Sequence, residues 1–282
     1  MLETRKLDLE QMVPTIVASV QTDTGCVREA NEDSGRHVSP NDLQTRLSKG
    51  TLTIVADGMG GHASGEVASQ MAVELISEFY YGNEGLATPE ALRTAIESAN
   101  SAIYDKSVSD EKYFGMGTTL VTLVLQENTA ISAHVGDSRL YRFRGGNLEM
   151  MTTDHSQVME MVKHGIISMD EARDHEDKNV ILRAVGTQPQ VEVEVSAVFE
   201  TEPGDTFLLC SDGLSDMIND DEIEAIMHTA ADIHTAAEEL IQAAKASGGH
   251  DNITVGIVRV SGAQEHEASR SVRITREVEA LV

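Results

Sequence analysis

The chain has 282 residues, of which 40% are apolar, and its acidic side chains outnumber the basic ones 47 to 21. This composition suits a globular protein with one large domain or two small ones. The formal net charge of −26 argues against nucleic acid as a partner, because such a field repels phosphate backbones. No stretch reaches the roughly 20 apolar residues that cross a bilayer, and the N-terminal residues lack a secretory signal's apolar run. We therefore expect no membrane association and a cytoplasmic protein.

The first half of the chain has strand and helix signals on either side of a glycine-rich turn. Thr15 to Asp23 alternates apolar and polar residues, and Thr51 to Ala56 is a second β-rich run. After the turn, Val67 to Phe79 has apolar residues at helical spacing, and Pro89 opens another segment of the same period. These patterns predict two strands followed by two amphipathic helices.

From Thr118 the hydrophobic period switches to two, which is typical of short strands. The runs 118–126, 129–135 and 140–144, with a further strand after the turn at Gly145-Gly146-Asn147, predict an antiparallel meander. The next stretch, residues 153–190, is polar and irregular, and we interpret it as a mobile flap with two short helices.

The last third of the chain returns to regular patterns. The predicted elements are strands at 191–199 and 206–210, helices at 220–229 and 232–246, and a last strand at 252–260. Strands interleaved with helix pairs suggest helices packed on antiparallel sheets within a single domain. We place this domain at residues 14–260, between a charged lead-in at 1–13 and a charged tail at 261–282.

Several acidic residues share one placement, at the end of an apolar strand or in a tight glycine-containing turn. They are Glu32 and Asp33 in VREANEDS, Asp57 in ADGMGGHASG, Asp137 in HVGDSRL, Asp212 in FLLCSDGL and Asp251 in GGHDNITVGIV. A single Asp before Gly is most often a turn former. Several carboxylates brought together repel each other unless divalent cations neutralise them, and an all-oxygen set selects Mg²⁺ or Mn²⁺ over Zn²⁺. The pattern predicts a metal site.

Six short motifs, in this order, resemble the bacterial branch of the metal-dependent protein phosphatase 2C family. They are R-x-x-N-E-D at 28–33, D-G-M-G-G-H at 57–62, G-T-T at 117–119, V-G-D-S-R at 135–139, S-D-G-L at 211–214 and G-x-D-N-I-T at 249–254. The resemblance runs from about Thr15 to Val260. It implies an α+β fold, a four-layer α-β-β-α sandwich of two antiparallel sheets flanked by helix pairs.

The resemblance also implies two core Mn²⁺ or Mg²⁺ ions and a weaker third ion. Asp57 matches the acid that bridges the core ions, and the Gly58 carbonyl matches a ligand of one of them. Asp212 and Asp251 match the acids that complete the shell of the first ion. Glu32 and Asp33 match the acids that bind the second ion, directly or through its waters. Asp137 and Asp212 match the acids of the third metal site.

The implied activity is hydrolysis of phosphoserine and phosphothreonine in proteins by direct attack of a metal-bridging hydroxide. Arg28, Asp33 and His62 are the candidate catalytic residues, and Arg28 matches the arginine that grips the substrate phosphate. Animal members have a proposed general-acid His two residues after the bridging Asp, where this chain has Met59. Either the nearby His62 or a water on the third ion is then the proton donor.

The resemblance implies phosphorylated proteins as substrates and a cognate serine/threonine kinase as the opposing enzyme. The alternative is a catalytically silent, phosphatase-like binding or regulatory module, whose signature is a missing carboxylate, and none is missing here. A two-metal phosphodiesterase or nuclease conflicts with the charge of −26 and with the lack of a basic patch beside the motifs.

Overall fold

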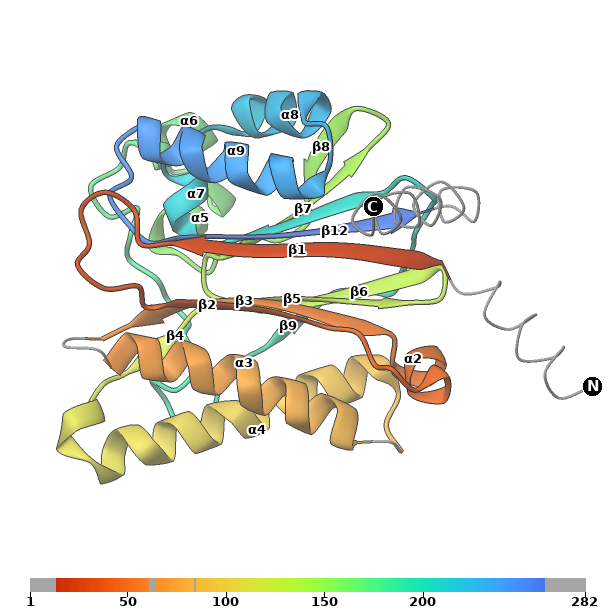
Figure 1. Cartoon of the computed structure of the whole chain (residues 1–282). Coiled ribbons are helices and arrows are strands. Elements are labelled where there is room, and N and C mark those ends of the chain that lie inside the picture. The colour runs from red at the N-terminus through yellow and green to blue at the C-terminus, as the bar shows by residue number, and fades with distance from the viewer. Residues whose placement is uncertain (1–13, 61–63, 84, 262–282) are drawn as a thin grey trace, which may run out of the picture.

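The structure is a computed structural model, and it describes residues 14–60, 64–83 and 85–261. Within these ranges the strands form two antiparallel sheets that lie face to face, with helices on both outer faces (Figure 1). The predicted α+β class and four-layer sandwich are therefore confirmed. The predicted lead-in lies outside the described residues. The predicted tail lies outside them too, except that its first residue, Ser261, is the last residue of a strand.

One described sheet has five strands in the spatial order β1-β12-β11-β7-β8. Their bounds are β1 (Thr15–Asp23), β7 (Arg139–Arg144), β8 (Asn147–Met150), β11 (Thr206–Cys210) and β12 (Ile253–Ser261). The first and last described strands pair along their whole length, from Thr15 opposite Ser261 to Asp23 opposite Ile253. This pairing brings the two ends of the domain together.

The second described sheet has seven strands, with the order β10-β6-β5-β3-β2 along its main path and β4 and β9 as short additions on β3 and β6. Their bounds are β2 (Asp33–Val38), β3 (Thr51–Met59), β4 (Gly117–Thr118), β5 (Leu120–Gln126), β6 (Thr129–Val135), β9 (Glu194–Val195) and β10 (Phe199–Glu200). β3 lies between β2 and β5 and is buried over most of its length.

The helices are α2 (Leu43–Lys49), α3 (Ser64–Gly82), α4 (Thr88–Ser109), the 3-10 turn η1 (Glu111–Tyr113), α5 (Gln157–Lys163), α6 (Met169–Arg173), α7 (Asp212–Ser215), α8 (Asp220–Thr229) and α9 (Ile233–Ala246). The pair α3 and α4 covers the outer face of the seven-stranded sheet, and α8 and α9 cover the outer face of the five-stranded sheet (Figure 1). No helix in the described part of the chain is long and apolar enough to cross a membrane.

Three buried layers hold the sandwich together, and β3 shows why. Successive strand residues face opposite sides. Ile54 and Ala56 accordingly pack toward α3 and α4, while Val55 lies between the two sheets with Leu209 and Val258. A strand that is buried on both faces is apolar at most positions, and in the run TLTIVA the two threonines are buried along with the apolar residues.

The predicted meander is wrong. β5 and β6 form a hairpin in the seven-stranded sheet, whereas β7 and β8 form one in the five-stranded sheet. The chain crosses from one sheet to the other at Gly136, whose φ of +104° suits glycine. Alternation of apolar and polar residues identifies a strand but does not show which sheet the strand joins. The crossing between the sheets could therefore not be predicted from the sequence.

Other differences are smaller. The predicted strand at 191–199 is reduced to the short β9 and β10, while β2, α2 and α7 have no counterpart among the predicted elements. β2 has the sequence DSGRHV and α2 is short and largely polar, so neither carries a clear hydrophobic period.

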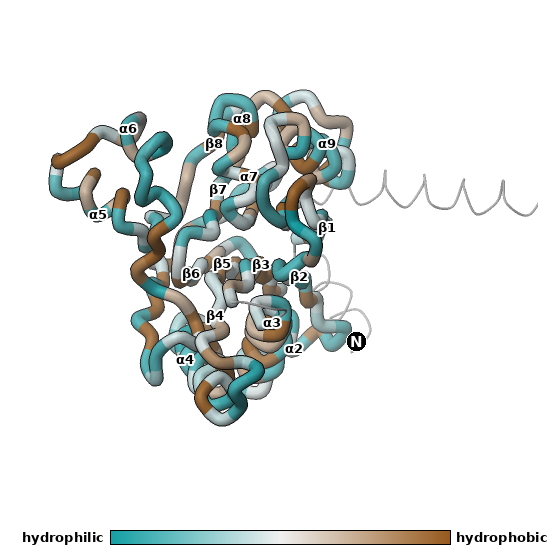
Figure 2. Tube along the Cα trace, turned by 90° about the vertical axis from the view of Figure 1, so that its left-hand side faces the viewer, coloured by the Kyte–Doolittle hydropathy of each residue, from teal (hydrophilic) through white to brown (hydrophobic). Residues whose placement is uncertain are grey.

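The predicted flap stands apart from the sandwich, with α5 and α6 projecting to one side (Figure 2). Two isolated bridges fasten the segment: Ser156 pairs with Ile181 within it, and Val185 of the flap pairs with Thr118 on the body. At the base of the flap, Arg183 forms an ion pair of 2.9 Å with Glu192.

Candidate active site

Two predicted acids begin and end neighbouring strands of the seven-stranded sheet. Asp33 is the first residue of β2 and is paired directly with Asp57 near the end of β3. Ser211, which precedes α7 in the other half of the sandwich, donates its hydroxyl to Oδ2 of Asp33 at 2.8 Å. The two sheets therefore meet at this pair of carboxylates.

The five-stranded sheet delivers two more acids to the same end. Asp212 follows the end of β11, and Asp251 precedes the start of the adjacent antiparallel strand β12. Asp137 comes from the crossing between β6 and β7. The structure thus brings together predicted residues that lie far apart in the sequence, and the charges of Asp33, Asp212 and Asp137 act directly on the pKa of Asp57.

Burial and mutual repulsion make this cluster unfavourable for bare carboxylates. Burial raises the pKa of Asp33 to about 6 and that of Asp137 to about 7. Burial, with the charges of neighbouring acids, also holds the pKa values of Asp57 and Asp212 well above their ordinary range. Divalent cations would relieve both effects.

Two buried oxygens of the cluster fit a metal directly. Among the described residues, Oδ1 of Asp33 and Oδ1 of Asp212 are buried and have no hydrogen-bond partner. Buried polar atoms are almost always satisfied, so such a pair calls for a ligand. The donor set is entirely carboxylate and carbonyl oxygen, which suits Mg²⁺ and Mn²⁺.

Glycines allow Glu32 to approach this cluster closely. A Cβ on Gly65 would lie 2.8 Å from the Glu32 carboxyl group, and a Cβ on Gly58 would lie 2.1 Å from the Gly65 carbonyl. The Gly58 N–H donates to the Glu32 carbonyl at 3.1 Å. Burial raises the pKa of Glu32. The structure therefore has Glu32 and Gly58 beside Asp57, as the sequence predicted, while the role of the Gly58 carbonyl stays a prediction.

Arg28 is more open than the acids. Its side chain is 53% exposed, and its guanidinium forms an ion pair of 2.7 Å with Oδ2 of Asp251. This ion pair raises the pKa of Arg28. A solvent-facing guanidinium at the rim of an acidic cluster is well placed to meet an incoming phosphate.

Sequence reasoning missed the hydroxyl residues that hold the acids. The backbone N–H of Thr119 and the hydroxyl of Thr118 both donate to the Asp57 carbonyl, at 2.9 and 2.8 Å. The Thr119 hydroxyl also bonds that of Ser138, at 2.7 Å, next to Asp137. The sequence did contain a sign of these contacts. The G-T-T motif includes both threonines, and it was the one family motif to which no chemical role had been assigned.

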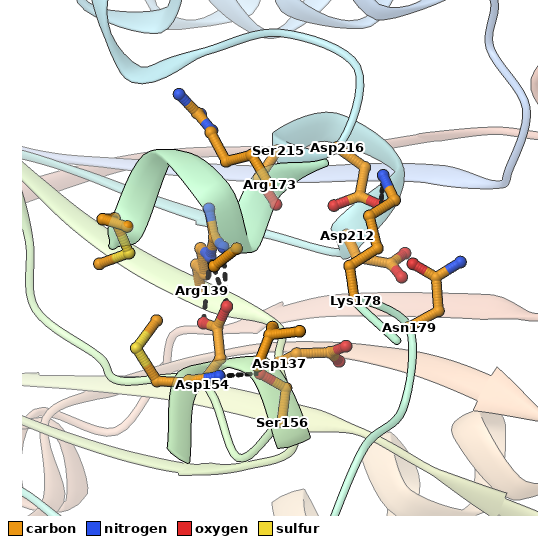
Figure 3. A pocket seen from close by; sticks show the side chains of 14 residues that line it. Asp137, Arg139, Asp154, Ser156, Arg173, Lys178, Asn179, Asp212, Ser215 and Asp216 are labelled. Atoms are coloured by element: carbon orange, nitrogen blue, oxygen red, sulfur yellow. Dashed lines mark hydrogen bonds and ion pairs between the residues drawn. The ribbon is translucent and has the colours of Figure 1, made fainter. Parts of the chain in front are cut away.

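A cavity of about 80 Å³ lies between the flap and α7, with Asp137 and Asp212 on its wall (Figure 3). The same wall also carries Lys178, which pairs with Asp216 at 2.9 Å. Arg139, also on the wall, forms a bidentate ion pair with Asp154, from Nε to Oδ1 at 3.0 Å and from Nη2 to Oδ2 at 2.7 Å. The third predicted metal site therefore opens into a space bordered by the flap.

His62 lies outside the described residues, so its predicted role stays a prediction. Met59, which occupies the position of the histidine in animal members, is the last residue of β3.

A second cluster of metal-binding residue types lies beside the cavity: His134, His155 and Glu194 have side-chain atoms within 4.8 Å of one another. The hydrogen bonds oppose a metal here. Nδ1 of His155 accepts the Gly136 N–H at 3.1 Å, so in the neutral ring the proton is on Nε2, which faces Glu194 at 3.2 Å. The Arg183 guanidinium also lies 3.2 Å from this Nε2, where its charge disfavours a metal cation. The two histidine rings are stacked, with an interplanar angle of 8°. This cluster fastens the Gly136 turn instead.

Comparisons with known proteins agree with this geometry. The family model described as Protein phosphatase 2C matches residues 30–248. The serine/threonine phosphatase Stp of Listeria welshimeri is 41% identical over 246 residues, covering 86% of this chain and 94% of that protein. Protein phosphatase PhpP of Streptococcus pneumoniae is 37% identical over 247 residues, covering 86% and 97%.

Solved structures give the same answer. The serine/threonine phosphatase PstP/Ppp of Mycobacterium tuberculosis superposes with a TM-score of 0.78 at 34% identity, covering 87% of this chain and 99% of that one. A catalytic domain of PstP in complex with two manganese ions gives 0.75 at 34% identity, covering 87% and 98%. The fold and the carboxylate cluster define a metal-dependent phosphatase. The chain belongs to the protein phosphatase 2C family.

Proposed function

We propose that this chain removes phosphate from phosphoserine and phosphothreonine in proteins, in a reaction that depends on Mn²⁺ or Mg²⁺. One observation carries the proposal: the whole predicted set of acids gathers at one end of the sandwich, with buried carboxylate oxygens that have no partner among the described residues. Stp and PstP, named above, are serine/threonine phosphatases, and the catalytic domain of PstP binds two manganese ions. The chain is accordingly a metal-dependent serine/threonine phosphatase.

Asp57, Asp212, Asp251 and the Gly58 carbonyl are the proposed holders of the core ions, with Glu32 and Asp33 on the second. When bound, such ions polarise phosphate oxygens and lower the pKa of water at neutral pH. Arg28 binds and orients the substrate phosphate through its fork of N–H donors. Asp137, which shares the cavity wall with Asp212, is the proposed holder of a weaker third ion.

A silent binding module is the alternative, and the complete acidic set argues against it. Phosphatase activity implies phosphoprotein substrates, and we propose a serine/threonine kinase as the opposing enzyme. We also propose that residues 14–260 are the catalytic domain. The cytoplasmic location stays a prediction from the sequence.

The test is hydrolysis of a phosphothreonine peptide and of an aryl phosphate with Mn²⁺ present and after chelation. We expect the wild type to turn over either substrate only when the metal is present. We expect Asp57→Asn to lose both this activity and its affinity for Mn²⁺. A matched control is Asp205→Asn, which removes a buried carboxylate that pairs with Arg144 at the opposite end of β11. That variant should lose stability and keep Mn²⁺ binding. Full turnover by Asp57→Asn at saturating Mn²⁺ would contradict the proposal.

A further inference from the structure

Asn252 uses its whole side chain to hold the loop that carries Arg28. Its amide Nδ2 donates to the carbonyls of Thr24 at 3.0 Å and Ala30 at 2.9 Å. Its Oδ1 accepts the backbone N–H of Glu32 at 2.8 Å. One side chain, directly before the start of β12, therefore fastens the start and the end of the loop 24–32.

The chemistry of these contacts requires asparagine. Two carbonyl acceptors and one N–H donor face the side chain, which fixes the amide orientation and uses both N–H donors and the oxygen. An aspartate of the same shape keeps the acceptor for Glu32 and places a carboxylate oxygen against the carbonyls of Thr24 and Ala30. Since Asn252 is 5% exposed, water cannot readily replace the lost donors.

The rest of the loop is fitted to the same segment. The Cys26 N–H donates to the Gly249 carbonyl at 2.7 Å. A Cβ on Gly25, whose φ is +80°, would lie 2.1 Å from the Asp251 carbonyl. By contrast, Val27 is 61% exposed, and the neighbouring Arg28 projects at the rim with its guanidinium on Asp251. The loop is thus anchored at its ends while its middle faces solvent.

We propose that Asn252 is a positioning residue for substrate phosphate: it fixes the loop 24–32 so that Arg28 is held ready at the rim of the carboxylate cluster. Without the side-chain amide of Asn252, the ends of the loop separate from the segment before β12 and the Arg28 guanidinium samples many positions. Substrate binding must then order the guanidinium, and this lowers the affinity for phosphate. The proposal rests on the proposed role of Arg28 and goes beyond it, because the side chain of Asn252 acts through the backbone groups of the loop that it bonds.

The test is a double-mutant cycle at saturating Mn²⁺ with p-nitrophenyl phosphate as substrate. We expect Asn252→Ala and Asn252→Asp each to raise KM about tenfold, in the range known for supporting contacts. In the Arg28→Ala background, either change should add less than about twofold, because the residue that Asn252 positions is already gone. Equal effects with and without Arg28 would overturn the inference while leaving the phosphatase activity intact. An unchanged KM in Arg28→Ala alone would instead contradict the role proposed for Arg28.

A second readout does not depend on activity. Amide hydrogen exchange of residues 24–32 should accelerate in Asn252→Ala and Asn252→Asp but not in Arg28→Ala. The matched control is Asn100→Ala, which removes another buried amide that bonds two backbone groups, Gly186 N–H at 2.7 Å and the Gln188 carbonyl at 3.0 Å. We expect it to lower Tm without changing KM or exchange in the loop. Unchanged exchange of 24–32 in both Asn252 variants would overturn the inference.

Discussion

Asp33 and Asp57 lie directly opposite each other across the β2–β3 pair. Like charges at such positions destabilise a sheet. Asp33 is buried and Asp57 is partly buried, and this burial raises the pKa of Asp33 to about 6 and that of Asp57 well above its ordinary range. The two carboxylates therefore destabilise the metal-free folded state at the place where the reaction is proposed to occur.

The first prediction is that metal-free protein loses stability as pH rises. The carboxyl of Asp33 has a folded-state pKa near 6 and an unfolded one near 4, so between these values the folded state binds the proton that the unfolded state has lost. The resulting penalty is absent below about pH 4 and complete above about pH 7. Asp33→Asn should therefore exceed the wild type by about 2 to 3 kcal/mol at pH 8 in chelator, and by about half as much at pH 5, which lies midway between the two pKa values.

Urea unfolding at both pH values, with chelator and then with Mn²⁺, checks this. Mn²⁺ should reverse the order, because it stabilises only the folded state that binds it. A stability difference between the variant and the wild type that stays constant from pH 5 to pH 8 would refute the electrostatic cause.

The second prediction separates charge from geometry at Arg28. Arg28→Ala removes charge-assisted hydrogen bonds worth about 1.5 to 3 kcal/mol, so KM for an aryl phosphate should rise roughly 10- to 150-fold. Arg28→Lys keeps the charge without the bidentate fork and should recover only part of this. Mn²⁺ affinity, measured by calorimetry, should change little in either variant. A large loss of Mn²⁺ affinity would instead give Arg28 a role at the metal.

The position of each acid at a strand end could be predicted from the sequence, because Asp57 and Asp212 follow apolar runs that end abruptly. The residues also supported a hard-metal site. Their convergence could not be derived from the pattern, because it depends on β2 pairing with β3 and β11 with β12, which join distant segments. The family resemblance supplied that arrangement.

The supporting side chains were harder to find. Ser211 and Asn252 contact residues 178 and 220 or more positions away, and a serine or asparagine next to an aspartate looks like an ordinary turn. The meander failed for the same reason, since alternation carries no information on which sheet a strand joins. Local sequence patterns identify helices and strands, whereas the pairing of distant strands determines which side chains come into contact.

The third prediction concerns His155, which holds the Gly136 turn next to Asp137. The ring Nδ1 of His155 accepts the Gly136 N–H, and the backbone N–H of His155 donates to the Gly136 carbonyl at 2.9 Å. Burial lowers the pKa of His155, which keeps the ring neutral and Nδ1 free to accept. His155→Asn places an acceptor near Nδ1, whereas His155→Gln places its polar atoms near Nε2.

We expect His155→Gln to raise the Mn²⁺ concentration needed for half-maximal phosphopeptide hydrolysis by about tenfold, and His155→Asn to recover most of it. Thermal unfolding of both variants without metal serves as the control for general destabilisation. If the two substitutions shift the Mn²⁺ requirement equally, the contact with Gly136 is not what matters.

The last prediction separates the two candidate proton donors. Asp137 and Asp212 are the acids proposed for the third ion, so that site has fewer protein ligands than the core pair and should fill last. If that ion's water protonates the leaving oxygen, Asp137→Ala should slow phosphothreonine peptides, whose alkoxide needs a proton, far more than an aryl phosphate, whose phenolate leaves readily. His62→Gln should then be nearly silent on both substrates. Steady-state rates on the two substrates at several Mn²⁺ concentrations decide between the two proton donors.

The opposite outcome, with His62→Gln selectively slowing the peptide and Asp137→Ala slowing both substrates equally, would assign the general acid to His62 and leave Asp137 to order the turn between the two sheets.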